Sequence, residues 1–109
     1  MAYDEGLAQR VRELMEEISG FSEKKMFGGI CFLINGNMAC GILDYDVIVR
    51  VGPENHEASL EKPNTHVFDF TGRPMKGWVV VSQGGHESDK NLFCWVKKGM
   101  DYAMSLPEK

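Results

Sequence analysis

The sequence predicts a single α+β domain in two layers, in which a largely antiparallel, five-stranded sheet packs against helices. The 109-residue chain has an amphipathic helix pattern near each end, runs of β-branched and aromatic residues between them, and short Gly-rich turns that join consecutive strands. Strands joined by tight turns pair antiparallel, and helices then pack mainly on one face of the sheet. The predicted order of elements is α-β-β-β-α-β-β-α, over one domain that spans residues 1–109.

The first helix is predicted over residues 4–19. Its apolar side chains recur at offsets of three and four, so they share one face of the helix. These residues are Leu7, Val11, Leu14, Met15 and Ile18. Asp4 is the expected N-cap, and Gly20 is the expected end of the helix.

Three strands are predicted next, arranged as a meander. The first covers residues 25–34 and the second covers 38–43, and Asn35-Gly36 between them is a strong signal for a two-residue hairpin. Residues 44–46 are expected to form a second turn, which leads into a β-branched strand over 47–51.

A short helix is predicted over residues 53–60, because Pro53 suits a first helical turn. Strands over 66–70 and 75–82 are expected to follow, joined by the loop 71–74. These two strands complete the predicted five.

Residues 83–86, Gln-Gly-Gly-His, are predicted to be a turn or loop. The last helix is expected to begin after an N-cap at Ser88 and to run to about Ser105. Its buried face is predicted to hold Leu92, Trp95, Val96, Met100 and Ala103.

Composition and charge narrow the classes of function. Hydrophobic residues make up 43% and charged residues 26% of the chain, which is ordinary for a globular domain. The net charge of -4 disfavours direct binding to nucleic acid, and no apolar run approaches the roughly 20 residues of a membrane span. Three widely spaced cysteines do not suggest a disulfide framework, and no signal peptide is recognisable. We therefore expect a cytoplasmic protein that contacts neither membranes nor nucleic acid directly.

The sequence contains no recognisable catalytic motif or metal-ligand spacing, so we expect no enzyme activity, no cofactor and no metal. Cys31 and Cys40 lie in predicted strands and Cys94 lies in the last helix, where a buried cysteine usually acts as a small hydrophobe. One alternative stays open, namely an enzyme that uses Cys31 or Cys40 as its nucleophile.

A basic loop is the main candidate for binding. Residues 71–78 enter a predicted buried strand and carry Arg73 and Lys76 together with a threonine and two glycines. Arg50, near the end of the third strand, can join them. Because arginine and backbone amides can hold a carboxylate or phosphate, Arg50, Arg73 and Lys76 are candidate anchors for an anionic metabolite.

A structural role is the alternative for Arg50 and Arg73. Either arginine would then form an ion pair with Asp69 or Glu54 and hold the loop in place. An arginine that is already paired is not free to bind a ligand, so the positions of these carboxylates decide between the two interpretations.

The pair Gly28-Gly29 is another candidate feature. Adjacent glycines inside a predicted strand indicate a β-bulge or a close approach of backbone, because no GxGxxG or P-loop pattern is present. Together with the Arg73 loop, Gly28 and Gly29 are the predicted contact surface for a protein partner.

One motif near the start of the predicted sheet is distinctive. The run Lys25-Met26-Phe27-Gly28-Gly29 is followed by Phe32 and then by Asn35-Gly36-Asn37-Met38. This pattern resembles the opening motif of TfoX N-terminal domains, from the family of TfoX/Sxy competence regulators.

The rest of the chain continues this resemblance. Residues 50–54 (Arg-Val-Gly-Pro-Glu) and 70–78 (Phe-Thr-Gly-Arg-Pro-Met-Lys-Gly-Trp) look like a group of stand-alone members, and so does the ending around Trp95 and Leu106-Pro107. The resemblance implies a helix, three strands, a helix, two strands and a helix. It also implies a role beside a transcription activator, as in the competence regulators, and it brings no catalytic residues to carry over.

The leading functional hypothesis is therefore a non-enzymatic regulatory module that works through contacts with a protein partner, which the resemblance links to transcription. The alternative is a small binding domain for an anionic metabolite. A short antiparallel sheet can also leave an edge strand unpaired, so a homodimer is a further arrangement to test.

Overall fold

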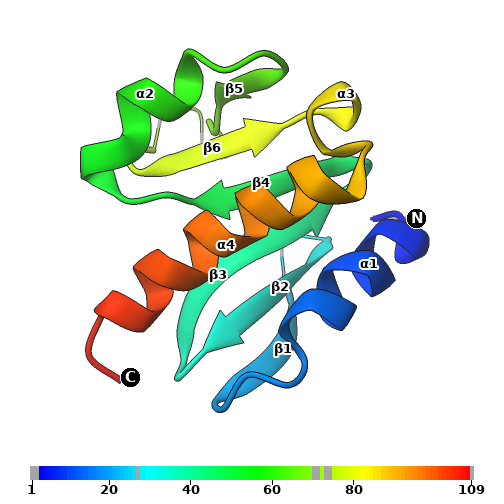
Figure 1. The fold of residues 1–109 in the computed structure, drawn as a ribbon, viewed down its shortest axis with the longest axis vertical. Coiled ribbons are helices and arrows are strands. Elements are labelled where there is room, and N and C mark those ends of the chain that lie inside the picture. Colours follow the sequence, from blue (N-terminus) through cyan, green and yellow to red (C-terminus); the bar gives the residue numbers. More distant parts are fainter. Residues whose placement is uncertain (1–2, 27, 70–71, 73–74, 109) are drawn as a thin grey trace.

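An open antiparallel sheet of six strands forms one layer of the computed structural model, and the helices form the other (Figure 1). The structure describes residues 3–26, 28–69, 72 and 75–108. The strands are β1 Phe21–Met26, β2 Gly29–Ile34, β3 Asn37–Leu43, β4 Asp46–Arg50, β5 Thr65–Val67 and β6 Trp78–Val81. The helices are α1 Glu5–Met15, the 3-10 helix η1 Pro53–Asn55, α2 His56–Leu60, α3 Gln83–His86 and α4 Asp89–Ser105. The predicted α+β fold class is thereby confirmed.

The strands lie side by side in the order β1-β2-β3-β4-β6-β5, and each neighbouring pair is antiparallel. The predicted meander of three strands corresponds to β2, β3 and β4. After α2, the chain returns to form β5 at the far edge and then β6 between β5 and β4.

Helix α1 begins where the sequence predicts and ends earlier. The carboxylate of Asp4 caps the helix by accepting a hydrogen bond from the backbone N–H of Gly6 at 3.1 Å. The helix ends at Met15 rather than near Ser19, because residues 16–20 turn the chain back toward the sheet.

Asn35 and Gly36 form the predicted hairpin between β2 and β3. Their φ angles of +54° and +82° are the left-handed values of a type I′ turn. Glycine adopts this conformation freely, and asparagine adopts it more readily than most residues. The Asn-Gly prediction is therefore confirmed.

A sixth strand is the main correction to the predicted topology. The pattern over residues 25–34 predicted one strand, but the chain turns back within it, so β1 and β2 form an antiparallel pair. Gly28, with a φ of +76°, lies between the two strands, which explains why the sequence needs glycine there. The sequence pattern did not reveal β1, because residues 22–25 are polar and exposed on an edge strand and have no apolar alternation.

Residues 83–86 are also a correction, because they form the short helix α3 rather than a turn. Gly85 is buried there, and a Cβ at this position would lie 2.7 Å from the side chain of Val81. The glycine therefore lets α3 pack directly against the end of β6.

The last two strands are shorter than predicted. β5 ends at Val67 and β6 begins at Trp78, whereas the predicted strands covered 66–70 and 75–82. Phe70 lies outside the described residues.

Helix α4 agrees with the prediction. The hydroxyl of Ser88 accepts a hydrogen bond from the N–H of Asn91 at 3.1 Å, as expected of an N-cap. The five apolar residues predicted for its inner face are all buried: Leu92, Trp95, Val96, Met100 and Ala103.

The hydrophobic core lies between the sheet and the helices α1 and α4, which cover the same side of it (Figure 1). Phe32, on β2, is fully buried, and its ring stacks on that of Phe21 with 6.1 Å between centroids. Helix α4 approaches the sheet closely at Gly99, where an added Cβ would collide with the carbonyl oxygen of Ala39. The absence of a side chain at Gly99 therefore sets the distance between the two layers.

Candidate functional site

Arg50 lies at the end of β4, and two aromatic rings fix its position. Its guanidinium carbon is 5.3 Å from the ring centroid of Trp78 and 5.3 Å from that of Tyr102. Trp78 is the cross-strand partner of Arg50 on β6, and Tyr102 comes from the last turns of α4. These cation–π contacts hold the half-buried guanidinium in place.

Neither carboxylate that the sequence suggested pairs with Arg50. Asp69 and Glu54 are both described and exposed, and neither forms an ion pair with this arginine. The structural alternative is therefore wrong for Arg50, because aromatic rings rather than a carboxylate hold its guanidinium. Arg73 lies outside the described residues.

Two glycines shape the backbone at this end of the sheet. Gly52 has a φ of +89°, and a Cβ on it would lie 2.6 Å from the ring of Tyr102, so the ring packs on bare backbone. The carbonyl of Gly77 accepts hydrogen bonds from the N–H groups of Val51 at 2.8 Å and Gly52 at 3.0 Å. The N–H of Gly77 in turn donates to Nδ1 of His56 at 2.7 Å. The backbone N–H groups of Val51, Gly52 and Gly77 are therefore all hydrogen-bonded.

The other predicted binding residues are not all gathered here. Lys76 is exposed and precedes Trp78 by two residues, which places it at the same end of the sheet as Arg50. Gly28 and Gly29 lie at the opposite end, because the strand register aligns the start of β2 with the start of β4. The structure therefore separates the glycine pair from Arg50 and Lys76.

Among the residues that the structure describes, no helix lies on one face of the sheet, and we call it the helix-free face (Figure 1). A row of cross-strand partners defines it: Cys31, Gly41, Ile48, Val80 and His66. On β2, β3, β4 and β6, the sequence neighbours of these residues point the other way and belong to the core under α1 and α4. Cys31 and Ile48 are each only 5% exposed, yet neither belongs to that core. Sequence reasoning missed this face, because strand pairing and helix placement are needed to define it.

A groove of about 330 Å³ crosses the helix-free face. Its lining is mostly apolar and comes from β3, β4, β5, β6 and the two residues after β5: Leu43, Asp46, Ile48, His66, Val67, Phe68, Asp69 and Val80. The charged groups in it are the carboxylates of Asp46 and Asp69. Partial burial raises the pKa of Asp46, and the nearby His86 works in the opposite direction.

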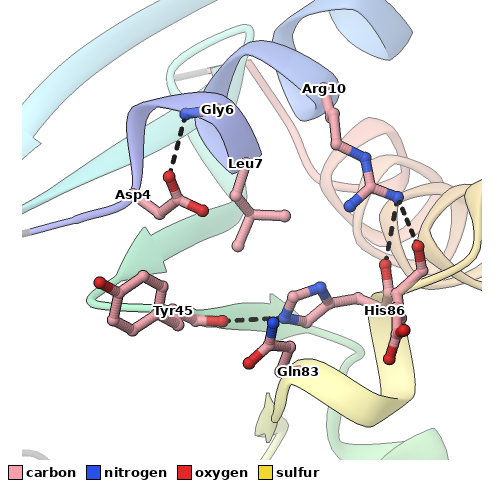
Figure 2. Close-up of a pocket in the computed structure, with 8 residues that line it drawn as sticks. Asp4, Gly6, Leu7, Arg10, Tyr45, Gln83 and His86 are labelled. Atoms are coloured by element: carbon pink, nitrogen blue, oxygen red, sulfur yellow. Dashed lines mark hydrogen bonds between the residues drawn. The ribbon is translucent and has the colours of Figure 1, made fainter.

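A second hollow, of about 310 Å³, lies between α1, the β3–β4 turn and α3 (Figure 2). Arg10 spans it from α1. Its Nη2 donates to the carbonyl oxygens of His86 at 3.2 Å and Glu87 at 3.1 Å, and to the carboxylate of Asp89 at 3.1 Å. Arg10 therefore ties α1 to the junction of α3 and α4.

His86 makes a second tie in the same hollow (Figure 2). Its Nε2 lies 2.8 Å from the carbonyl oxygen of Tyr45 and must carry the proton, because a carbonyl oxygen only accepts. The side chain is 3% exposed, and its Nδ1 is buried without a partner among the described residues. Because Nε2 is already hydrogen-bonded and Nδ1 is buried, we assign His86, together with Arg10, to joining elements rather than to chemistry. The sequence suggested only a turn at His86.

The three cysteines are free and occupy different settings. Cys31 and Cys40 are buried on opposite faces of the sheet, and Cys94 is exposed on α4. Burial raises the pKa of Cys40 to about 12 and also raises the pKa of Cys31. A thiol with a raised pKa stays protonated at neutral pH and is a poor nucleophile, so the geometry gives no support to a cysteine-based reaction.

The rate at which each cysteine is alkylated is expected to depend on its burial. In the folded protein, iodoacetamide at neutral pH should modify Cys94 and spare Cys31 and Cys40, which should react only after unfolding in urea. Mass spectrometry of the peptides would measure this, and a Cys94→Ser variant, which should stay unlabelled while folded, is the control. Rapid labelling of Cys40 in the folded chain would contradict the assignment.

Metal-binding geometry is not found in the part of the chain that the structure describes, where no three His, Cys, Asp or Glu side chains gather closely enough to hold an ion. Within the same residues, no helix combines the length and the apolar character that crossing a membrane requires.

The comparison with protein families gave one result that covers most of the chain. The model of the TfoX N-terminal domain matches residues 13–103. The comparison with curated proteins gave no match. The match includes the pattern over residues 25–38 and the segment 70–78, which both suggested this resemblance in the sequence.

Proposed function

This chain belongs to the TfoX N-terminal domain family, and we propose that it is a non-enzymatic module that binds a protein partner through its helix-free face. The single observation that carries the proposal is that the sheet is apolar on both faces but covered by helices on one (Figure 1). β2 reads Gly-Ile-Cys-Phe-Leu-Ile, without the polar alternation of a sheet that faces water.

The groove supports the choice of this face. A mostly apolar groove of about 330 Å³ with a few polar side chains in its lining is typical of a surface that contacts another protein. Its charged groups are the carboxylates of Asp46 and Asp69, so we propose a partner segment with apolar side chains and a basic residue.

The family and the cysteines support a proposal for the cellular setting. Competence regulators, to which the chain is similar, act beside a transcription activator, so we propose a regulator of transcription as the partner. Three free thiols suit a reducing cytoplasm, where we place the complex.

Pairing between two copies along the edge strand β1 is less favourable than binding through the face. When two identical strands pair antiparallel about a two-fold axis, one residue lies opposite its own copy. Near the middle of β1 that residue would be Glu23, Lys24 or Lys25, and like charges directly opposite each other destabilise a sheet. We therefore propose a different protein, rather than a second copy, as the partner.

A charge placed on the helix-free face should abolish partner binding. Leu43→Glu puts a carboxylate in the groove at a half-buried position, so the fold should persist while the apolar contact is lost. The tagged parent and variant would be used to capture partners from the native host, and the captured protein would then be purified for calorimetric titration. The expected result is a partner that binds the parent and loses at least about tenfold in affinity for the variant.

Phe93→Glu is the matched control. Phe93 is 43% exposed on the outer side of α4, away from the helix-free face, so its replacement should leave partner binding unchanged. If Leu43→Glu captured and bound the same partner as the parent, the proposed face would be wrong.

A further inference from the structure

The three arginines that the structure describes differ in what their guanidinium groups bind. Arg10 donates to two carbonyl oxygens and to the carboxylate of Asp89. Arg12 forms a two-pronged pair with Glu23, with 2.9 Å between Nη2 and Oε1. Arg50 donates to no acceptor among the described residues, although its side chain is half-buried. Its N–H groups are therefore left for water or for a ligand.

The guanidinium of Arg50 is also held in position before any ligand binds. Trp78 and Tyr102 both lie 5.3 Å from its central carbon, and Trp78 is itself supported by Phe68, with 6.1 Å between ring centroids. Stacking on ring faces leaves the donor edge of a guanidinium available, and that edge matches the two oxygens of a carboxylate. A fixed side chain loses less conformational entropy when it binds.

The surrounding backbone favours a carboxylate over a phosphate as the ligand of Arg50. Phosphate sites usually recruit several free backbone N–H groups in addition to basic side chains. Here the N–H groups of Val51, Gly52 and Gly77 are already bonded within the protein, and so is that of Trp78, which donates to the carbonyl of Met75 at 3.2 Å. One arginine without backbone donors suits a single negative charge with two coplanar oxygens.

We propose that Arg50 is the anchor of a binding site for a carboxylate group, with Trp78 and Tyr102 as its walls. This site goes beyond the proposed function. Arg50 and Trp78 share the sheet face of Ile48 and Val80 by strand alternation, but they lie at one end of it, and neither they nor Tyr102 line the groove. Exposed Lys76 adds positive charge at the same end of the sheet. The carboxylate belongs either to a small organic acid or to the C-terminus of a protein chain.

The test is a titration of the full chain followed by NMR, with benzoate and inorganic phosphate as probes. Benzoate should produce saturable shifts of the Arg50 Nε–H and Trp78 indole signals, and phosphate should bind more weakly. Phosphate binding at Arg50 as tight as that of benzoate would overturn the carboxylate assignment. The absence of any saturable shift with benzoate would overturn the site itself, without need of a variant.

Arg50→Lys is the variant that separates charge from geometry. It keeps the positive charge but loses the two-pronged edge, so benzoate affinity should fall by about tenfold or more. Arg12→Lys is the matched control, because that guanidinium is already occupied by Glu23, and it should bind benzoate like the parent. Equal affinity of Arg50→Lys and the parent would overturn the proposal.

Further measurements distinguish the two possible sources of the carboxylate, and they also distinguish this site from the proposed helix-free face. A short peptide with a free C-terminal carboxylate should bind more tightly than benzoate if the natural ligand is a protein terminus, and less tightly if it is an organic acid. The amidated peptide should not bind at Arg50 in either case, and binding equal to that of the free acid would contradict the site. Leu43→Glu should still bind benzoate, so failure of the helix-free face leaves this test intact.

Discussion

Phe32→Ala is expected to lower the free energy of unfolding by about 3–5 kcal/mol. Phe32 is fully buried at the middle of β2, and its ring stacks on Phe21, so its removal leaves a cavity between the sheet and the helices. The total stability of a domain this size is about 5–15 kcal/mol, so the variant should lose a large share of it. Urea unfolding followed by far-UV circular dichroism would measure the change.

Phe93→Ala is the control for that experiment. Phe93 is 43% exposed on α4, and its replacement should change the unfolding free energy by less than about 0.5 kcal/mol. A Phe32→Ala protein as stable as the Phe93→Ala protein would show that the core is not centred where the structure places it.

Gly99→Ala is expected to lower the free energy of unfolding by about 1–3 kcal/mol, although alanine is the better helix former by about 1 kcal/mol. An added Cβ would collide with the carbonyl oxygen of Ala39 and lie 3.0 Å from its carbonyl carbon. Both atoms belong to the backbone of β3, so the contact is relieved only if α4 moves away from the sheet. Urea unfolding with an unchanged m-value would identify a loss of native-state packing.

Gly6→Ala is the matched substitution in the other long helix. A Cβ at Gly6 would lie 3.5 Å from the nearest atom outside its neighbours, which is ordinary contact. This variant should be neutral or up to about 1 kcal/mol more stable than the parent. If Gly99→Ala behaved in the same way, the close approach of α4 to β3 would be refuted.

Features that depend on near neighbours in the chain could be predicted well. The caps of α1 and α4 at Asp4 and Ser88 rest on hydrogen bonds that span two or three residues. The hairpin at Asn35-Gly36 rests on two φ angles that these residue types tolerate. Such signals are complete within a few positions, so the type and order of most elements could be recognised before the fold was known.

The predictions that were wrong concern features that depend on distant parts of the chain. β1 is stabilised by its pairing with β2 and not by its own polar sequence, and α3 exists because Gly85 fits against Val81. Both depend on surfaces supplied by other parts of the chain. The same is true of Arg50, for which the sequence suggested Asp69 or Glu54 as an ion-pair partner, whereas the structure supplies aromatic rings from β6 and α4.

The sequence by itself determined the α+β class, the family and the N-caps of the two long helices, since periodicity, caps and turns are local properties of the chain. Only the tertiary structure decided which face of the sheet lacks helices and which of the three described arginines lacks an acceptor. Those outcomes depend on the order β1-β2-β3-β4-β6-β5 and on the side from which α1 and α4 approach. Contacts between distant segments arise from packing against all other elements at once, and no local pattern records them.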